Sequence, residues 1–206
     1  MNIETIIVGP LDVNCFIISC PKTKQSAIID PGENADDILQ SIKSKSLDVK
    51  YILLTHGHFD HIGAVADISA ATHSDILLHA DDQEQVDAAP AHAGFFGLPV
   101  PKSFSVDRYV NEEDTLEIGE LTLTVLHTPG HSRGCVCYLG KDVIFAGDTL
   151  FYGGVGRTDL PGGNYQAIIQ SIKEKLFALP DAMRVYSGHG PPTTIGREKK
   201  YNPFVS

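Results

Sequence analysis

Three histidines and a carboxylate lie within six consecutive residues, in the segment His56-Gly57-His58-Phe59-Asp60-His61. An apolar run of strand length precedes the segment, and a run with helical apolar spacing follows it. Loops between such elements often carry catalytic groups. Imidazole and carboxylate ligands suit Zn, Mn or Fe, whereas Ca and Mg prefer oxygen ligands. The segment is too short to wrap all of these side chains around one ion, so the pattern predicts two neighbouring metal ions.

A structural explanation of the same histidines is weaker. A single histidine is usually a core or surface residue, and nine in 206 residues is only somewhat high. The clustering directly behind an apolar strand, however, is hard to explain without a metal. The histidines that lack this strand-and-turn context are interpreted as non-ligands: His73, His79, His92 and His127.

Three further candidate ligands repeat one local pattern. His131, Asp148 and His189 each follow an apolar run of strand length, and each has a glycine immediately before it. Glycine lets the backbone turn sharply and approach a metal closely. The repetition predicts that these three side chains join the ligands of residues 56–61.

Together these motifs resemble the metallo-β-lactamase superfamily and, within it, the short glyoxalase II-like (hydroxyacylglutathione hydrolase-like) proteins. The narrower resemblance rests on residues 147–151, 156–159, 161–163 and 188–196. It implies a four-layer αββα sandwich, whereas the pattern of strands and helices alone predicts only a mixed α/β domain. The resemblance covers essentially the whole chain. We therefore expect a single domain over residues 1–206, without the C-terminal helical domain of longer glyoxalase II enzymes.

The resemblance also implies a ligand set for two divalent metal ions per chain. It assigns the first metal to His56, His58 and His131, the second to Asp60, His61 and His189, and a bridging role to Asp148. Zinc is favoured. Iron and manganese remain alternatives, because nitrogen and oxygen ligands without cysteine do not discriminate among these three metals. Asp60 and Asp148 are the predicted catalytic carboxylates. They would orient a water whose pKa the metals lower.

The predicted reaction is metal-dependent hydrolysis of a small-molecule thioester, with glutathione-linked thioesters included. A thiol with a pKa of about 8.5 leaves without a proton donor, whereas the nitrogen of an amide or β-lactam needs one, and none is obvious. The alternative is a persulfide dioxygenase with a single iron, a family that shares a Gly-Arg-Thr-Asp stretch like residues 156–159. An RNA-processing nuclease is the third, less favoured reading.

Three residues are predicted to contact the substrate: Arg157, Tyr152 and Phe96. Phe96 belongs to the apolar segment 95–101, which would form a wall or lid beside the metals, or else fill the core or a dimer contact. For Arg157 an ion pair with Asp159 is an equal alternative. Lys199 and Lys200 are weaker candidates and are better explained as a solvated tail.

The remaining composition narrows the class of protein. A net charge of −10 disfavours binding to a phosphate backbone, so we expect no nucleic-acid partner. The first residues lack a basic region and a long apolar stretch, so we expect no signal peptide, no membrane contact and a cytoplasmic location. Four cysteines are too few for a disulfide framework, and Cys135 and Cys137 are interpreted as core residues facing one side of a strand. The oligomeric state is expected to be a monomer or homodimer.

The apolar pattern also predicts the elements that must position these residues. Strands are expected near 2–8, 13–19, 25–30, 50–54, 74–79, 115–118, 121–127, 134–139, 142–147 and 183–187. Helices are expected near 34–45, opened by Asn34, and near 61–71, 81–87 and 164–177.

Overall fold

Two six-stranded sheets form the centre of the protein in the computed structural model, which describes residues 1–205. The first sheet has the order β1-β2-β3-β4-β5-β6, and the second has the order β14-β13-β10-β9-β8-β7. The strands of the first sheet are β1 (Asn2–Val8), β2 (Val13–Ser19), β3 (Gln25–Ile29), β4 (Asp48–Leu53), β5 (Asp75–His79) and β6 (Arg108–Val110). Those of the second are β7 (Thr115–Ile118), β8 (Leu121–His127), β9 (Val136–Leu139), β10 (Val143–Gly147), β13 (Arg184–Ser187) and β14 (Thr193–Thr194). A short ribbon pairs β11 (Leu150–Phe151) with β12 (Gly154–Val155).

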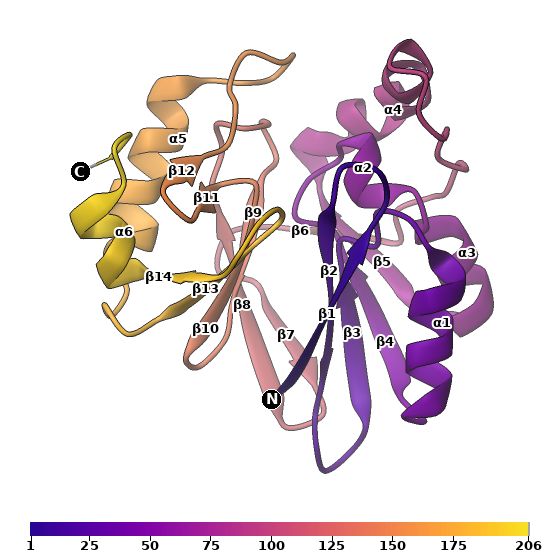
Figure 1. Ribbon diagram of the computed structural model, residues 1–206. Coiled ribbons are helices and arrows are strands. Elements are labelled where there is room, and N and C mark those ends of the chain that lie inside the picture. The colour runs from indigo at the N-terminus through magenta and orange to yellow at the C-terminus, as the bar shows by residue number, and fades with distance from the viewer. Residues whose placement is uncertain (206) are drawn as a thin grey trace.

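Helices cover the outer face of each sheet (Figure 1). Beside the first sheet lie α1 (Ala35–Ser44), α3 (Val65–Thr72) and α4 (Gln83–Phe95), which follows a 3-10 turn at Ala80–Asp82. The one-turn helix α2 (Phe59–Ile62) contains two of the predicted ligands. Beside the second sheet lie α5 (Tyr165–Ser171), its π-helical continuation Ile172–Leu176, and α6 (Ile195–Tyr201).

Three separate clusters of buried apolar side chains correspond to the three interfaces between four layers. On β2, Cys15 and Ile17 pack toward the helices of the first half, whereas the alternate residues Phe16 and Ile18 pack toward the second sheet. On β10 and β13 the same alternation divides the side chains between the inter-sheet cluster and the cluster under α5 and α6. This period of two, with both faces buried, is what a sheet needs inside a sandwich. The predicted four-layer αββα arrangement is confirmed.

The helix expected near 61–71 is divided into α2 and α3, with Gly63 at the break. The backbone of Gly63 packs directly on the preceding loop, and a Cβ atom there would lie 2.1 Å from the carbonyl oxygen of Gly32. Gly32 is equally confined, because its own Cβ would lie 1.9 Å from the carbonyl oxygen of Asp60. The two glycines therefore bring the loop after β3 against the ligand segment.

Replacing Gly63 with alanine is expected to lower the free energy of unfolding by about 1–3 kcal/mol, because the added methyl group overlaps backbone that cannot shift alone. Gly94 in α4 offers a matched control, since a Cβ there would meet nothing within 4 Å. Denaturant unfolding of the Gly63→Ala and Gly94→Ala variants measures the difference. Equal stability of the two variants would show that the contact with Gly32 is not confining.

The helix expected near 81–87 is longer than expected, because α4 continues to Phe95. The remaining differences from the expected elements are local. The strands β6, β11, β12 and β14 contain only two or three residues each, too few for a periodic pattern, and the sequence did not predict them or α6. Asn34 precedes α1 as expected, but it has a positive φ and its side chain makes no cap bond to the helix. Its Oδ1 instead accepts a hydrogen bond from the backbone of Gly9.

The four cysteines are free and buried, which agrees with the prediction that Cys135 and Cys137 are core residues. Strand β9 begins at Val136, however, so Cys135 lies before the strand rather than within it. Of the helices described in residues 1–205, none combines the length and apolar character that a membrane span requires.

Candidate metal centre

The seven predicted ligands converge from four loops, each of which follows a strand. The loop after β4 carries His56 and His58, and α2 carries Asp60 and His61. The other three come from the second half: His131 precedes β9, Asp148 follows β10 and His189 follows β13. The nitrogen atoms of His56, His58 and His131 lie within 4.8 Å of one another, and all three residues are buried. His58 Nδ1 and His131 Nε2 are 2.8 Å apart.

A second group is formed by Asp60, His61 and His189, whose ligand atoms also lie within 4.8 Å of one another. Asp60 Oδ2 lies 3.7 Å from His61 Nε2 and 3.5 Å from His189 Nε2. The group therefore presents two imidazole nitrogens and one carboxylate oxygen toward a common point, which is a ligand set that transition metals accept.

Asp148 lies between the two groups and reaches both. Its Oδ1 is 3.5 Å from His61 Nε2 in the second group. Its Oδ2 is 3.5 Å from His131 Nε2 in the first group and 3.6 Å from His189 Nε2 in the second. A carboxylate in this position can share its oxygens between two neighbouring ions.

Unpartnered polar atoms test whether these residues fit metal ions. Within residues 1–205, the buried side-chain nitrogens and oxygens without a hydrogen-bond partner are His56 Nε2, His61 Nε2 and Asp148 Oδ1. Leaving such an atom buried and unpaired costs about 1–3 kcal/mol. All three atoms belong to the predicted ligand set. Metal ions would satisfy them, so the donor set fits a two-metal centre.

The charges of the ligands also favour bound cations. Burial, reinforced by neighbouring histidines, lowers the pKa of His56 well below its usual value and that of His58 to about 3, so both rings are neutral and can donate lone pairs. For His61 burial acts in the same direction, but Asp148, Asp60 and Asp30 outweigh it and raise the pKa to about 10. Asp148, Asp60 and Asp30 thus surround His61 with negative charge, which bound cations would offset.

Asp30 is a supporting residue that the sequence analysis did not identify. It is buried beside the metal centre and accepts hydrogen bonds from His61 Nδ1 at 3.1 Å and from Thr55 Oγ1 at 2.6 Å. Thr55 Oγ1 in turn lies 3.0 Å from His56 Nδ1. These contacts hold the Nδ1 protons of both histidines, so their Nε2 atoms are left free for metal. A partial signal was available, because Asp30 directly follows an apolar strand and a glycine lies two residues after it.

Asp82 is a second supporting residue that the sequence did not reveal. It is fully buried, and Asp82 Oδ2 accepts from the backbone N–H of Gly57 at 2.8 Å and from Ser132 Oγ at 2.7 Å. Asp82 Oδ1 accepts from the backbone N–H of Gly134 at 2.6 Å. Asp82 thereby ties the segment of His56 and His58 to the loop of His131. The requirement for glycine in His-Gly-His also follows, since a Cβ on Gly57 would lie 2.7 Å from the carbonyl oxygen of Asp82.

Backbone carbonyl groups orient two of the other three histidines. His131 donates from Nδ1 to the carbonyl oxygen of Arg157 at 2.8 Å, and His189 donates from Nδ1 to the carbonyl oxygen of Leu11 at 2.9 Å. Both bonds use Nδ1, so the Nε2 atom of each ring is the one directed at the other candidate ligands. The His189 contact also brings the β1–β2 turn to the edge of the centre.

The histidines interpreted as non-ligands lie outside these two groups. His79 and His127 stack with ring centroids 4.2 Å apart, and Asp81 lies beside them. Their hydrogen bonds already use His79 Nδ1, which accepts from the backbone N–H of Asp81, and His127 Nε2, which contacts the carbonyl oxygen of Arg133. Parallel rings do not direct two lone pairs at one point.

A cavity of about 710 Å³ opens over the metal centre. Phe96 and Arg157, two of the three predicted substrate contacts, line it. The third, Tyr152, is not among the lining residues. Its ring lies against the guanidinium of Arg197 at 3.5 Å, and the neighbouring Phe151 faces the cavity instead. Lys199 and Lys200 belong to α6 rather than to a solvated tail, and Lys199 pairs with Asp181.

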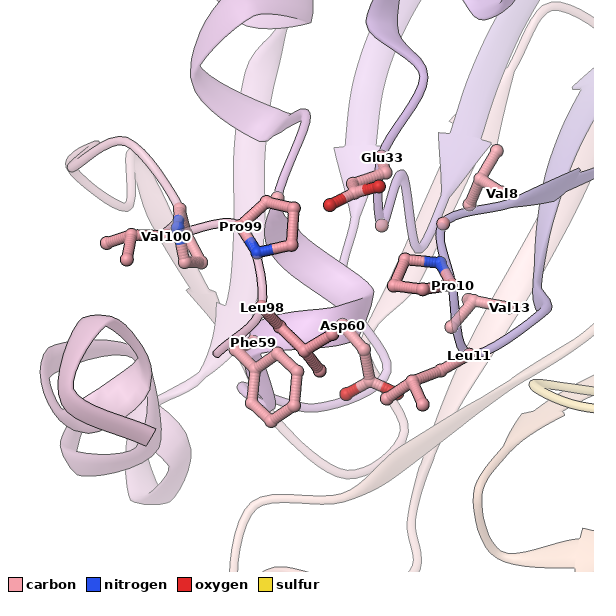
Figure 2. A pocket seen from close by; sticks show the side chains of 14 residues that line it. Val8, Pro10, Leu11, Val13, Glu33, Phe59, Asp60, Leu98, Pro99 and Val100 are labelled. Carbon is pink, nitrogen blue, oxygen red and sulfur yellow. The ribbon is translucent and has the colours of Figure 1, made fainter. Parts of the chain in front are cut away.

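A smaller cavity of about 70 Å³ adjoins the large one and shares part of its wall (Figure 2). Figure 2 shows Phe59 and Leu98 side by side, with the Asp60 carboxylate between them and Leu11. Glu33 lines the far side of this smaller cavity. The residue between the ligands His58 and Asp60 is therefore an aromatic wall residue, which the ligand pattern alone does not indicate.

Comparison with known families identifies the superfamily and the fold. The sequence pattern of the metallo-beta-lactamase superfamily matches residues 8–189, from the end of β1 to the last predicted ligand. The chain belongs to the metallo-β-lactamase superfamily. The resemblance inferred from the ligand motifs is thereby confirmed.

Two relatives match nearly the full length of this superfamily member. The hydroxyacylglutathione hydrolase GloC of Haemophilus influenzae is 41% identical over 210 residues, which cover 100% of this chain and 99% of that protein. The probable metallo-hydrolase YqgX of Bacillus subtilis is 42% identical over 204 residues, with 97% of this chain and 95% of that protein covered.

Solved structures of the superfamily superpose closely. The B3 metallo-beta-lactamase BLEG-1 has a TM-score of 0.93 at 38% identity, with all of both chains covered. TTHA1623 in a di-iron-bound form has a TM-score of 0.89 at 38% identity, with 98% of this chain and 99% of that chain covered. ETHE1 from Myxococcus xanthus has a TM-score of 0.85 at 29% identity, with 100% of this chain and 84% of that chain covered.

Proposed function

We propose that this protein is a thioester hydrolase of the hydroxyacylglutathione hydrolase type that uses two metal ions per chain. The observation that carries the proposal is the position of Asp148, whose two oxygens reach both three-residue ligand groups. The similarity to GloC over the full length supports this class of substrate. The similarity to TTHA1623 in its di-iron-bound form supports a centre for two metals, and zinc, iron and manganese all suit these ligands.

The bound metal ions would lower the pKa of a water and polarise the substrate carbonyl. The residues of the chain supply the rest of the chemistry. For Asp60, burial alone would raise the pKa of the carboxyl, but His61, His189 and His58 together lower it far below the usual value. Asp60 would therefore be ionised and could accept a hydrogen bond from the attacking water, as could Asp148. Both carboxylates would orient that water toward the carbonyl carbon of the substrate.

A thioester suits this cavity because its leaving group does not need a proton donor. A thiolate with a conjugate-acid pKa of about 8.5 leaves without being protonated in the same step. The titratable residues that line the cavity are metal ligands apart from His92 and Arg157, and Arg157 is already paired with Asp159. Among the lining residues this leaves His92 as the candidate donor that an amide nitrogen would require, whereas a thioester requires none, which supports the thioester.

Persulfide dioxygenation is the second candidate, because the chain resembles ETHE1 and shares the Gly156-Arg157-Thr158-Asp159 stretch noted above. A single iron would leave one complete ligand group unused. Asp60, His61 and His189 are all present and already converge, which supports hydrolysis with two metals instead.

Metal content and activity, measured on one preparation, test the proposal. We expect about two metal ions per chain and hydrolysis of S-lactoylglutathione. In the Asp60→Ala variant we expect a loss of at least about 10²-fold in kcat/KM together with lower metal content. One iron per chain with persulfide-dependent oxygen uptake and no hydrolysis would overturn the proposal.

A further inference from the structure

We infer that the cavity over the metal centre binds the apolar acyl group of its substrate against an aromatic wall formed by Phe59 and Phe96. The thioester linkage in this inference rests on the proposed function. The apolar character of the bound group rests on the cavity itself, so the two can be tested separately.

The aromatic wall begins within the ligand segment. Phe59 lies between the ligands His58 and Asp60, and its ring centroid is 6.2 Å from that of Phe96, with the planes inclined by 30°. Phe95 adds a T-shaped contact at 5.2 Å from Phe96. Phe59, Phe96 and most of the candidate ligands line one cavity, so one of the two substituents of a carbonyl group placed at the metals can lie beside this wall.

Phe96 has an unusual environment for a large apolar side chain. It is 58% exposed, although it lines a concave cavity rather than a convex surface. Large exposed apolar surface in a cavity is stabilised when a ligand covers it. Phe59 is half-buried and packs against the core of the first half, so it provides a fixed base for the more exposed ring.

The opposite side of the cavity is also apolar. It is lined by Phe151 and Val155 of the short β11–β12 ribbon, and by Leu160 in the loop that follows. Leu98 extends the first wall, beside Phe59 (Figure 2). A group that enters between the two walls is therefore covered by apolar side chains on two sides, whereas the floor consists of metal ligands.

The cavity offers little positive charge to the glutathione part of a thioester. Glutathione carries two carboxylates, and a glutathione thioester would hold them outside the cavity while its acyl group lies inside. Among the residues that line the cavity, all within the described part of the chain, Arg157 is the one arginine or lysine. Its ion pair with Asp159 is bidentate, because Nε and Nη2 each donate a hydrogen bond of 2.8 Å to the carboxylate. Apolar contact is therefore the main source of binding that the cavity offers.

Thioesters of one small neutral thiol, N-acetylcysteamine, test the inference as the acyl group is lengthened from acetyl to octanoyl. Burial of each added methylene is expected to raise kcat/KM by about threefold to fourfold until the wall is covered. The Phe96→Ala variant should lose most of this dependence on chain length, and Phe96→Leu should keep part of it. Phe204→Ala is the matched control, because Phe204 is 51% exposed and does not line the cavity.

Binding of the corresponding carboxylic acids, from acetate to octanoate, provides a readout that does not depend on turnover. Calorimetry with metal-loaded protein should show a Kd that falls with each methylene in the wild type and much less in Phe96→Ala. Hydrolysis of all the thioesters at one rate, with a Kd independent of chain length, would overturn the inference and leave the proposed function intact. Chain-length-dependent binding without any thioester hydrolysis would support the apolar site and overturn the proposed function.

Discussion

Replacing Asp148 with asparagine is expected to reduce thioester hydrolysis by at least about 10²-fold and to lower metal content at the same time. The asparagine keeps the volume of the side chain but removes the negative charge, and it turns one oxygen acceptor into an N–H donor. Asp148 Oδ1 and Oδ2 face His61 Nε2 and His131 Nε2 at 3.5 Å each. Whichever way the amide is oriented, its NH₂ group is directed at one of the two groups of ligands.

The outcome distinguishes a shared carboxylate from a ligand to one metal only. A shared carboxylate predicts that occupancy of both sites falls, as measured by metal analysis after dialysis against a fixed free metal concentration. Asp67→Asn is the control, because Asp67 forms an exposed ion pair with Lys102 and such pairs contribute little. Two full metal equivalents together with unchanged hydrolysis in Asp148→Asn would contradict the bridging role.

The candidate ligands could be selected from the sequence because each carries a strong local signal. His131, Asp148 and His189 combine an apolar strand, a glycine and a metal-binding side chain within a few residues, so their loops could be recognised without knowledge of the contacts between strands. The same reasoning predicted the strands that carry them to within about two residues. The four-layer arrangement needed the family resemblance, because an alternating pattern does not say which sheet a strand joins.

The supporting residues could not be predicted in the same way. Asp82 is one of 26 acidic residues, and it follows β5 in a polar stretch that has neither glycine nor proline beside it. Its role exists only because the chain brings Gly57 and Gly134 to the same place from 25 residues earlier and 52 residues later. The position of Phe59 in the cavity wall could not be predicted either, because any residue type is allowed between His58 and Asp60 in the ligand pattern.

Replacing Asp82 with alanine is expected to lower the free energy of unfolding of the metal-free protein by about 3–5 kcal/mol. The substitution removes the acceptors of three buried hydrogen bonds and leaves the backbone N–H groups of Gly57 and Gly134 without partners, whereas Ser132 Oγ keeps its contact with Cys135 Sγ. The loss also separates the loop that carries His131 from the segment that carries His56 and His58. We therefore expect metal affinity to fall by about 10- to 100-fold, as is common when a residue that supports a ligand is removed.

Two further variants test whether the losses of stability and metal affinity come from the hydrogen bonds of Asp82 or only from the removal of a negative charge. In Asp82→Asn the amide oxygen can still accept from Gly57 and Ser132, but the NH₂ group faces the N–H of Gly134, so an intermediate loss of stability is expected. Asp81→Ala removes the neighbouring carboxylate, whose side chain is 61% exposed, and should leave stability and metal affinity nearly unchanged. Denaturant unfolding of metal-free protein and metal titration provide the two measurements. If Asp82→Ala matched Asp81→Ala in both, the contacts of Asp82 would not be what holds the two ligand loops together. If stability fell while metal affinity did not, Asp82 would support the fold without positioning the histidines.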